Sequence, residues 1–160
     1  MSQIETLPLD RIEIDPDVLP REHMAVDQDL VHVYMDSFDA LPPIRAFRLN
    51  GHVLLSDGMH RLAAARQLGH SEIRVEVESG TRQDAMADAV LSNWRHGKPL
   101  TLVERASGIH RLHSVCGWTE EQIAKEMGMP RTTVNDHVQA YPLYLTTVVK
   151  TSTKLSYDLQ

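Results

Sequence analysis

Residues 53–65 constrain the fold of this chain more than any other stretch. An apolar run of strand character leads directly into Asp57-Gly58, and an alanine-rich run of helical character begins at the next residue. Glycine tolerates backbone conformations that other residues disfavour, so the chain can turn sharply here. The sequence therefore predicts a strand, turn and helix unit, in which Ala63, Ala64 and Ala65 let the helix lie close to a sheet.

The segments around this unit alternate between strand and helix patterns. Strands are predicted over 7–14, 44–49, 53–56 and 73–77, and helices over 27–40, 59–68 and 81–94. Pro8 restricts the first strand to a sheet edge, and Asn50-Gly51 predicts a hairpin because both residues tolerate a positive φ. We therefore expect a small mixed sheet with helices packed on it.

Beyond residues 97–99 the pattern becomes wholly helical. Helices are predicted over 101–115, 119–127 and 131–140. The expected fold class is therefore α+β, with a mixed-sheet domain over 1–95, an all-α domain over 96–142 and a helical or flexible tail over 143–160.

The two helices over 119–127 and 131–140 have the pattern of a helix-turn-helix. Thr119 and Gln122 can form a capping box, Gly128 makes the turn, and Val134 and Val138 face inward. The side chains left facing outward are Arg131, Thr132, Thr133, Asn135 and His137. Short hydroxyls and an amide near a helix N-terminus suit contacts to DNA phosphates and base edges, although a plain helical hairpin with a solvated face is the alternative.

Charge is distributed unevenly along the chain. The formal net charge is −6, but residues 1–94 carry a balance of −8 and residues 95–160 a balance of +2. A polyanion such as double-stranded DNA is therefore expected to meet the C-terminal part.

The turn at Gly58 is a candidate anion site. His60 and Arg61 lie in the first turn of the predicted helix, where cations oppose the helix dipole unless an anion joins them. The free N–H groups of that turn, together with Arg61, can cradle a phosphate. The alternative is that Asp57 and Gly58 simply make a tight turn and Arg61 pairs with a carboxylate such as Asp57.

The string from Asp57 to Arg61, followed by three alanines, resembles the signature of the ParB/sulfiredoxin superfamily. The resemblance extends from Leu9 to Asn93 and continues into the helix-turn-helix, in the same order as in ParB. It implies a ParB/sulfiredoxin-like nucleotide-binding domain that binds CTP (or ATP) with Mg²⁺ as cofactor. It also implies a role in partition or transcription regulation. The implied nucleotide or phosphate contacts are Arg21, Asp57, Gly58, Met59, His60, Arg61 and Asn93.

Departures from the family pattern narrow this implication. Partition proteins of the family carry Gly-Glu-Arg-Arg, whereas Met59 and His60 stand at the two middle positions here, and their second motif keeps only Asn93 in register. Met59 also stands where a sulfiredoxin has its cysteine, which excludes cysteine-sulfinate repair. A weak CTPase activity is implied only for a chain that acts as a ParB clamp.

The Asp-Gly-x-His-Arg form of the motif is similar to that of free serine kinases and of ParB-like transcriptional regulators. The alternative function is therefore an enzyme, a small-molecule serine kinase or a nuclease, with Asp57 or Glu22 as general base. Otherwise no catalytic residue is expected.

The remaining expectations concern partners and location. Helix-turn-helix proteins commonly bind two half-sites, so a homodimer is expected. The single Cys116, the missing signal pattern and the lack of a membrane-length apolar stretch predict a cytoplasmic protein without a membrane partner. His110, His113 and Cys116 spread over roughly 120° of a helix and do not converge on one metal, so the metal ligands remain unknown.

Overall fold

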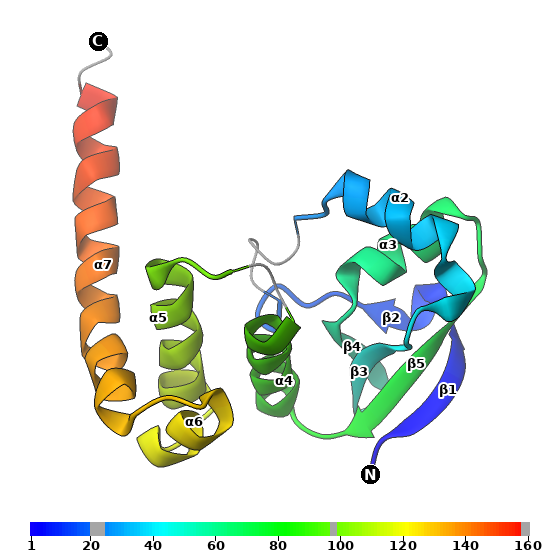
Figure 1. Cartoon of the computed structure of the whole chain (residues 1–160), viewed down its shortest axis with the longest axis horizontal. Helices are drawn as coiled ribbons and strands as arrows, with labels where there is room; N and C mark the ends of the chain where they lie inside the picture. Colours follow the sequence, from blue (N-terminus) through cyan, green and yellow to red (C-terminus); the bar gives the residue numbers. More distant parts are fainter. Residues whose placement is uncertain (20–24, 97–98, 158–160) are drawn as a thin grey trace. The chain divides into compact units, whose positions relative to one another are not determined.

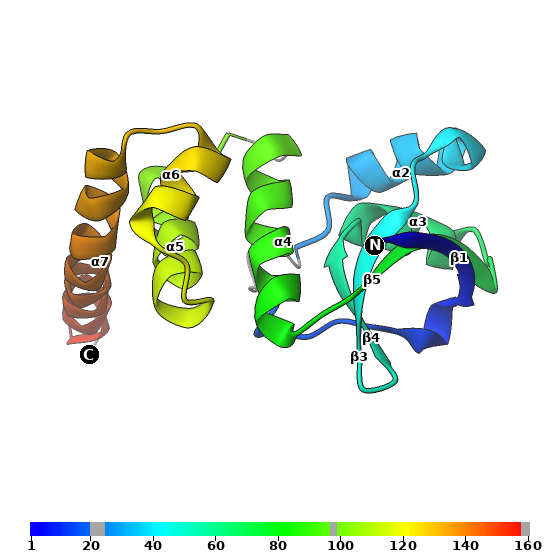
Figure 2. The ribbon, with the colours of Figure 1, turned by 90° about the horizontal axis from the view of Figure 1, so that it is seen from below.

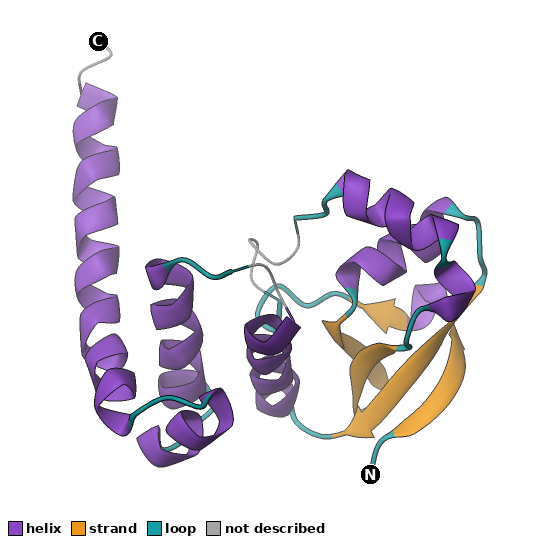
Figure 3. Ribbon diagram, viewed as in Figure 1, coloured by secondary structure: helices purple, strands orange, loops and turns teal. Residues whose placement is uncertain are grey.

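The computed structural model describes residues 1–19, 25–96 and 99–157 of the chain, with backbone only for 146–157. The chain divides into two compact units, Met1–Ser92 and Asn93–Gln160 (Figure 1). The first unit contains a sheet and the second is wholly helical (Figure 3). No helix within the described ranges is long and apolar enough to cross a membrane.

The first unit is built on a five-stranded mixed sheet. The strands are β1 (Gln3–Pro8), β2 (Ile12–Glu13), β3 (Ile44–Leu49), β4 (His52–Asp57) and β5 (Glu72–Ser79), in the order β1-β5-β3-β4-β2. The pairs β1·β5 and β3·β4 are antiparallel, whereas β5·β3 and β4·β2 are parallel. The predicted α+β class and mixed sheet are therefore confirmed.

The prediction of one strand over 7–14 is wrong. β1 ends at Pro8, a 3₁₀ turn η1 (Leu9–Arg11) follows, and β2 lies at the opposite edge of the sheet. Pro8 has no N–H to continue a ladder, and the Leu9 N–H donates instead to the Ser71 carbonyl at 3.0 Å. The apolar alternation of this segment therefore serves two edge strands rather than one.

The hairpin at Asn50-Gly51 forms as predicted between β3 and β4. Asn50 has φ 50° and Gly51 has φ 86°, which is the conformation that the type I′ turn requires. Asn50 is the sole residue other than glycine with positive φ among those described.

Helices cover both faces of the sheet. They are α2 (Gln28–Asp36), α3 (Met59–Gln67) and α4 (Arg82–His96), with a 3₁₀ turn η2 (Phe38–Ala40). Ile44 of β3 lies against the start of α3, while the next residue, Arg45, pairs with Asp88 of α4 at 2.8 Å. Because successive strand residues point to opposite faces, α3 and α4 lie on opposite sides of β3 (Figure 2). Ala65 and Ala89 take part in the resulting core.

The predicted helix over 27–40 is shorter in the structure. Asp27 caps α2 by accepting from the N–H groups of Asp29 and Leu30, and α2 ends at Asp36. Ser37 separates α2 from η2 with a non-helical backbone. The apolar periodicity continues across this break, which explains why the sequence pattern predicted a single helix.

The second unit contains α5 (Leu102–His110), a π-helical segment η3 (Arg111–Val115), α6 (Glu120–Met127) and α7 (Arg131–Tyr157). Its buried residues are Ala106, Ile109, Leu112, Ile123, Met127 and Val134. The predicted helix over 131–140 continues through Pro142 to Tyr157, so the described part of the tail is helical, which is one of the two alternatives expected for it. A proline removes one helical hydrogen bond and can kink a helix without ending it.

Candidate functional site

The turn at Gly58 requires glycine for two reasons. Gly58 has φ 108° and ψ 29° and directly precedes α3. A Cβ added here would lie 2.6 Å from Cγ2 of Ile44 and 2.9 Å from its Cβ. Both the backbone conformation and the close approach of β3 therefore exclude a larger residue.

Arg61 lies beneath this turn and is largely buried, with 13 % of its side chain exposed. Its guanidinium donates to Oδ2 of Asp57 at 2.9 Å and to the carbonyls of Pro42 and Pro43 at 3.0 and 2.6 Å. Arg61 thus holds the segment before β3 against the start of α3. The pairing with Asp57 is the alternative to an arginine that is free to bind phosphate.

His60 and Met59 also face the protein. The Nε2 atom of His60 accepts a hydrogen bond from the backbone N–H of Asp27 at 3.1 Å, which connects the starts of α3 and α2. A ring nitrogen that accepts carries no proton, so this bond requires the neutral imidazole protonated at Nδ1. Met59 packs against the core of the sheet domain.

Backbone N–H groups are further candidate anion donors at this turn. The start of α3 has no side-chain cap and no acidic residue in its first turn. The Leu62 N–H donates to the Gly58 carbonyl at 2.9 Å, so the N–H groups before it precede the helical ladder. The positive end of the helix dipole adds to their attraction for a negative group.

Two further predicted contacts are not placed at this turn. Arg21 lies outside the described residues. Asn93 lies in α4, within the second unit.

A polar cluster beside the turn was not predicted from the sequence. The buried Ser56 hydroxyl donates to Oδ2 of Asp88 at 2.6 Å, and Arg45 pairs with Oδ1 of the same carboxylate at 2.8 Å. Burial raises the pKa of Asp88, against the opposing effects of the Ser56 hydrogen bond and the Arg45 charge. The one signal in the sequence was a serine at the end of an apolar strand.

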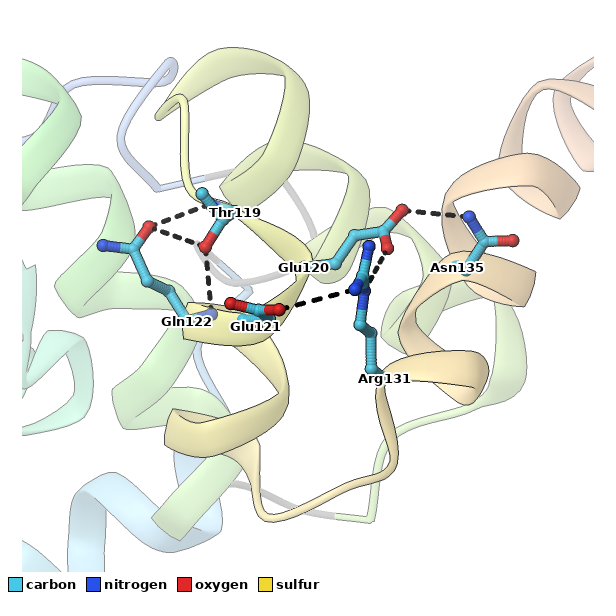
Figure 4. A network of polar contacts seen from close by, with 6 residues as sticks. All are labelled: Thr119, Glu120, Glu121, Gln122, Arg131 and Asn135. Atoms are coloured by element: carbon cyan, nitrogen blue, oxygen red, sulfur yellow. Dashed lines mark hydrogen bonds and ion pairs between the residues drawn. The ribbon is translucent and has the colours of Figure 1, made fainter.

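The second unit forms a helix-turn-helix from α6 and α7. Thr119 Oγ1 accepts from the Gln122 N–H at 3.2 Å, and Gln122 Oε1 accepts from the Thr119 N–H at 2.8 Å, so the predicted capping box is present (Figure 4). Gly128 has φ 65° and ends α6. Ile123 and Val134 are fully buried, which holds the two helices together.

The N-terminal turns of α7 contact two acidic residues of α6. Arg131 Nε donates to Glu120 Oε2 at 3.0 Å, and its Nη1 donates to Glu121 Oε1 at 3.4 Å. Asn135 Nδ2 donates to Glu120 Oε1 at 2.9 Å (Figure 4). The hydrogen bonds from Asn135 and Arg131 hold the pKa of Glu120 below its usual value, and Glu120 in turn raises the pKa of Arg131.

The structure thus places the predicted DNA contacts on one helix but in different surroundings. Arg131 and Thr132 are exposed, whereas Thr133, Asn135 and His137 are half-buried. Sequence reasoning missed Glu120 and Glu121. Acidic residues are common in the first turn of a helix because they favour its dipole, so nothing local distinguished these two.

Known proteins resemble this chain, most specifically in its second unit. Residues 98–150 match the family model of the ParB HTH domain. The chain is 34% identical over 128 residues to the transcriptional regulator NovG of Streptomyces niveus, and 38% identical over 79 residues to a possible regulatory protein of the streptomycin biosynthesis operon in Streptomyces griseus. These alignments cover 78% and 49% of this chain, but only 40% and 23% of the two relatives.

A solved structure shares the fold across both units. It is the C-terminally truncated chromosome-partitioning protein ParB from Caulobacter crescentus in complex with the centromeric parS site. The TM-score is 0.61 at 22% identity, covering 84% of this chain and 70% of that chain. The second unit therefore contains a ParB HTH domain, and the chain shares the fold of this ParB structure, with a mixed-sheet domain followed by a helical one.

Proposed function

We propose that this chain binds double-stranded DNA selectively through α6 and α7 and acts as a transcriptional regulator. The observation that carries the proposal is the exposed start of α7, where Arg131 and Thr132 stand on a helix that Val134 and Ile123 anchor to α6. The match of residues 98–150 to the ParB HTH domain supports it. The names of the two regulatory relatives favour a role in transcription over one in partition.

The polar residues at the start of α7 suit different contacts to DNA. Arg131 can reach a phosphate or the acceptors of guanine, and the hydroxyls of Thr132 and Thr133 suit phosphate oxygens. The amide of Asn135 suits a base edge in the major groove. Two copies of the chain on adjacent half-sites would provide the usual symmetric complex, so we propose a homodimer on DNA.

A phosphate-bearing ligand is proposed for the turn at Gly58. The uncapped first turn of α3 supplies backbone donors and a positive dipole, with the Arg61 guanidinium below it. CTP or ATP are the candidate nucleotides. Mg²⁺ commonly binds one or two carboxylates together with nucleotide phosphates. Because Asp57 Oδ2 accepts from Arg61, Oδ1 is the oxygen of this carboxylate that would contact the metal. The described residues contain no cluster of three or more His, Cys, Asp or Glu side chains that could hold a metal ion by themselves.

Selective DNA binding is tested by gel shift with genomic fragments at physiological salt. The full chain is expected to retard a small set of fragments in the presence of random competitor DNA. The Arg131→Ala variant should weaken that binding, because it removes a cation from the contact surface. Equal retardation of all fragments, with and without nucleotide, would contradict the proposal.

Calorimetry with CTP, ATP and GTP tests the ligand site separately. Binding of one nucleotide is expected, with loss of that binding in Arg61→Ala.

The identity of the DNA fragments retarded in the gel shift distinguishes the two regulatory roles. Fragments retarded near biosynthetic or regulatory promoters would support the regulator, whereas enrichment at one repeated site near the replication origin or plasmid partition genes would support partition instead.

An enzyme of the same fold is the second candidate. Of the two candidate bases, Glu22 lies outside the described residues, and Asp57 is paired with Arg61 at 2.9 Å. This pairing occupies one oxygen of the carboxylate that would otherwise accept a substrate proton, which favours the binding function. Incubation with labelled ATP and free serine, or with supercoiled plasmid and Mg²⁺, distinguishes the two, because turnover that Asp57→Ala abolishes would indicate the enzyme.

A further inference from the structure

Glu120 contacts two polar residues in the first two turns of α7, Arg131 and Asn135. One carboxylate oxygen accepts from Asn135 at 2.9 Å and the other accepts from Arg131 at 3.0 Å. The Glu120 side chain is 20% exposed, whereas that of its neighbour Glu121 is 78% exposed. Arg131 and Asn135 are four residues apart on α7, so they lie on one face, and Glu120 bridges them.

The chemistry of this contact determines which way the Asn135 amide points. An ionised carboxylate only accepts hydrogen bonds, so the group facing Glu120 must be the NH₂ of Asn135. The amide oxygen then points away from Glu120, as Figure 4 shows. Hydrogen bonds from Asn135 and Arg131 favour the ionised form of Glu120, which maintains this orientation.

We infer that Glu120 is a positioning residue that determines base preference, by fixing Asn135 with its amide oxygen free to accept from a base. This inference rests on the proposed DNA-binding function. In the major groove the adenine N6 and cytosine N4 amines are donors, whereas guanine N7 and O6 and thymine O4 are acceptors. A base that donates to this amide oxygen is therefore adenine or cytosine.

Glu121 provides a matched control. It is adjacent to Glu120 in the chain and contacts Arg131 at 3.4 Å, whereas the hydrogen bond from Asn135 goes to Glu120. Glu120→Gln and Glu121→Gln make the same change in net charge and size. Glutamine at 120 can present either its oxygen or its NH₂ to Asn135, so the amide orientation is no longer determined.

The experiment is selection from a library of DNA duplexes with a randomised centre, using the full chain. Wild type, Glu120→Gln, Glu121→Gln and Asn135→Ala are compared, and circular dichroism checks that each variant folds. The position at which Asn135→Ala loses its base preference identifies the base pair that Asn135 contacts. At that position wild type should favour adenine or cytosine over guanine and thymine by about tenfold. Glu120→Gln should lower that preference to about threefold or less at this position alone, whereas Glu121→Gln should retain it.

Two results would overturn the inference while leaving DNA binding intact. One is a Glu120→Gln variant that keeps the wild-type preference at the Asn135 position. The other is a wild-type preference for guanine or thymine there. If Glu120→Gln fails to fold, Glu120→Ala takes its place, because alanine offers no acceptor to Asn135 and should likewise lower the preference to about threefold or less. If wild type enriches no sequence at all, the proposed function fails, and this inference fails with it.

Discussion

The guanidinium of Arg61 donates to the carbonyl of Pro43 at 2.6 Å, although 18 residues separate them in the chain. The same guanidinium pairs with Asp57, so one side chain holds together the end of β4, the start of α3 and the approach to β3. This is the place where the family signature is found. The signature arginine therefore contributes to the fold of the sheet domain as well as to the proposed ligand site.

Arg61→Ala is expected to destabilise the first unit by about 1 to 3 kcal/mol, because it leaves two backbone carbonyls and the Asp57 carboxylate without a donor. Urea unfolding followed by circular dichroism measures the change. Arg66→Ala is the control, since Arg66 is exposed on the same helix and should alter stability by less than about 0.5 kcal/mol. Equal effects of the two substitutions would show that Arg61 has no structural role.

Gly58→Ala is expected to destabilise the protein more than Gly69→Ala. Both glycines have positive φ, but a Cβ at Gly58 meets Ile44 at 2.6 Å, whereas a Cβ at Gly69 meets nothing within 4 Å. The alanine at 69 should therefore show only the backbone penalty of about 1 to 2 kcal/mol, and the alanine at 58 about 1 to 3 kcal/mol more. Thermal and urea unfolding of the two variants test the difference, and similar losses would argue against the close approach of β3.

The stability of the first unit should depend on pH through Asp88. Burial raises the pKa of this carboxyl above its ordinary value of 3.8, so the folded protein holds the proton more tightly than the unfolded chain. The stabilisation is therefore fully present below about pH 3.8 and is lost as pH rises through the folded pKa, at about 1.4 kcal/mol for each unit by which the pKa is raised. Asp88→Asn removes this dependence.

The measurement is the difference in unfolding free energy between wild type and Asp88→Asn in urea, from pH 3 to 7. That difference should move in favour of the asparagine variant as pH rises. Ser56→Ala removes the hydrogen bond that lowers the pKa of Asp88, so the stability of this variant should continue to fall up to a higher pH than that of wild type. A difference between wild type and Asp88→Asn that stays constant across this range would contradict the prediction.

Glu121→Gln is expected to strengthen DNA binding about two- to fivefold at low salt. It removes an exposed negative charge beside Arg131, and so releases that cation for phosphate contact and reduces repulsion. Fluorescence anisotropy with a fixed duplex at several salt concentrations measures it, with a steeper salt dependence expected. Glu72→Gln makes the same change in net charge on an exposed residue of β5. An equal gain in that variant would attribute the effect to total charge alone.

The sequence by itself determined the features that depend on neighbouring residues. The turn at Asn50-Gly51 and the capping box between Thr119 and Gln122 follow from contacts within a few positions, and both are present. Local signals likewise predicted α3, α4 and α6, namely an alanine-rich run in α3 and capping residues at the starts of α4 and α6. The end of α2 was misplaced, since the periodicity crosses its break at Ser37.

Only the tertiary structure decided which distant groups meet. The segment 7–14 looked like one strand, but the strand order sends its two halves to opposite edges of the sheet. Asp88 finds Ser56, and Glu120 finds Asn135 15 residues away, because sheet and helix packing bring them within hydrogen-bond distance. Such contacts leave no periodic signal in the sequence, since each depends on the geometry of several elements at once. The residues predicted for the surface of α7 were visible in the sequence, whereas the carboxylate that orients one of them was not.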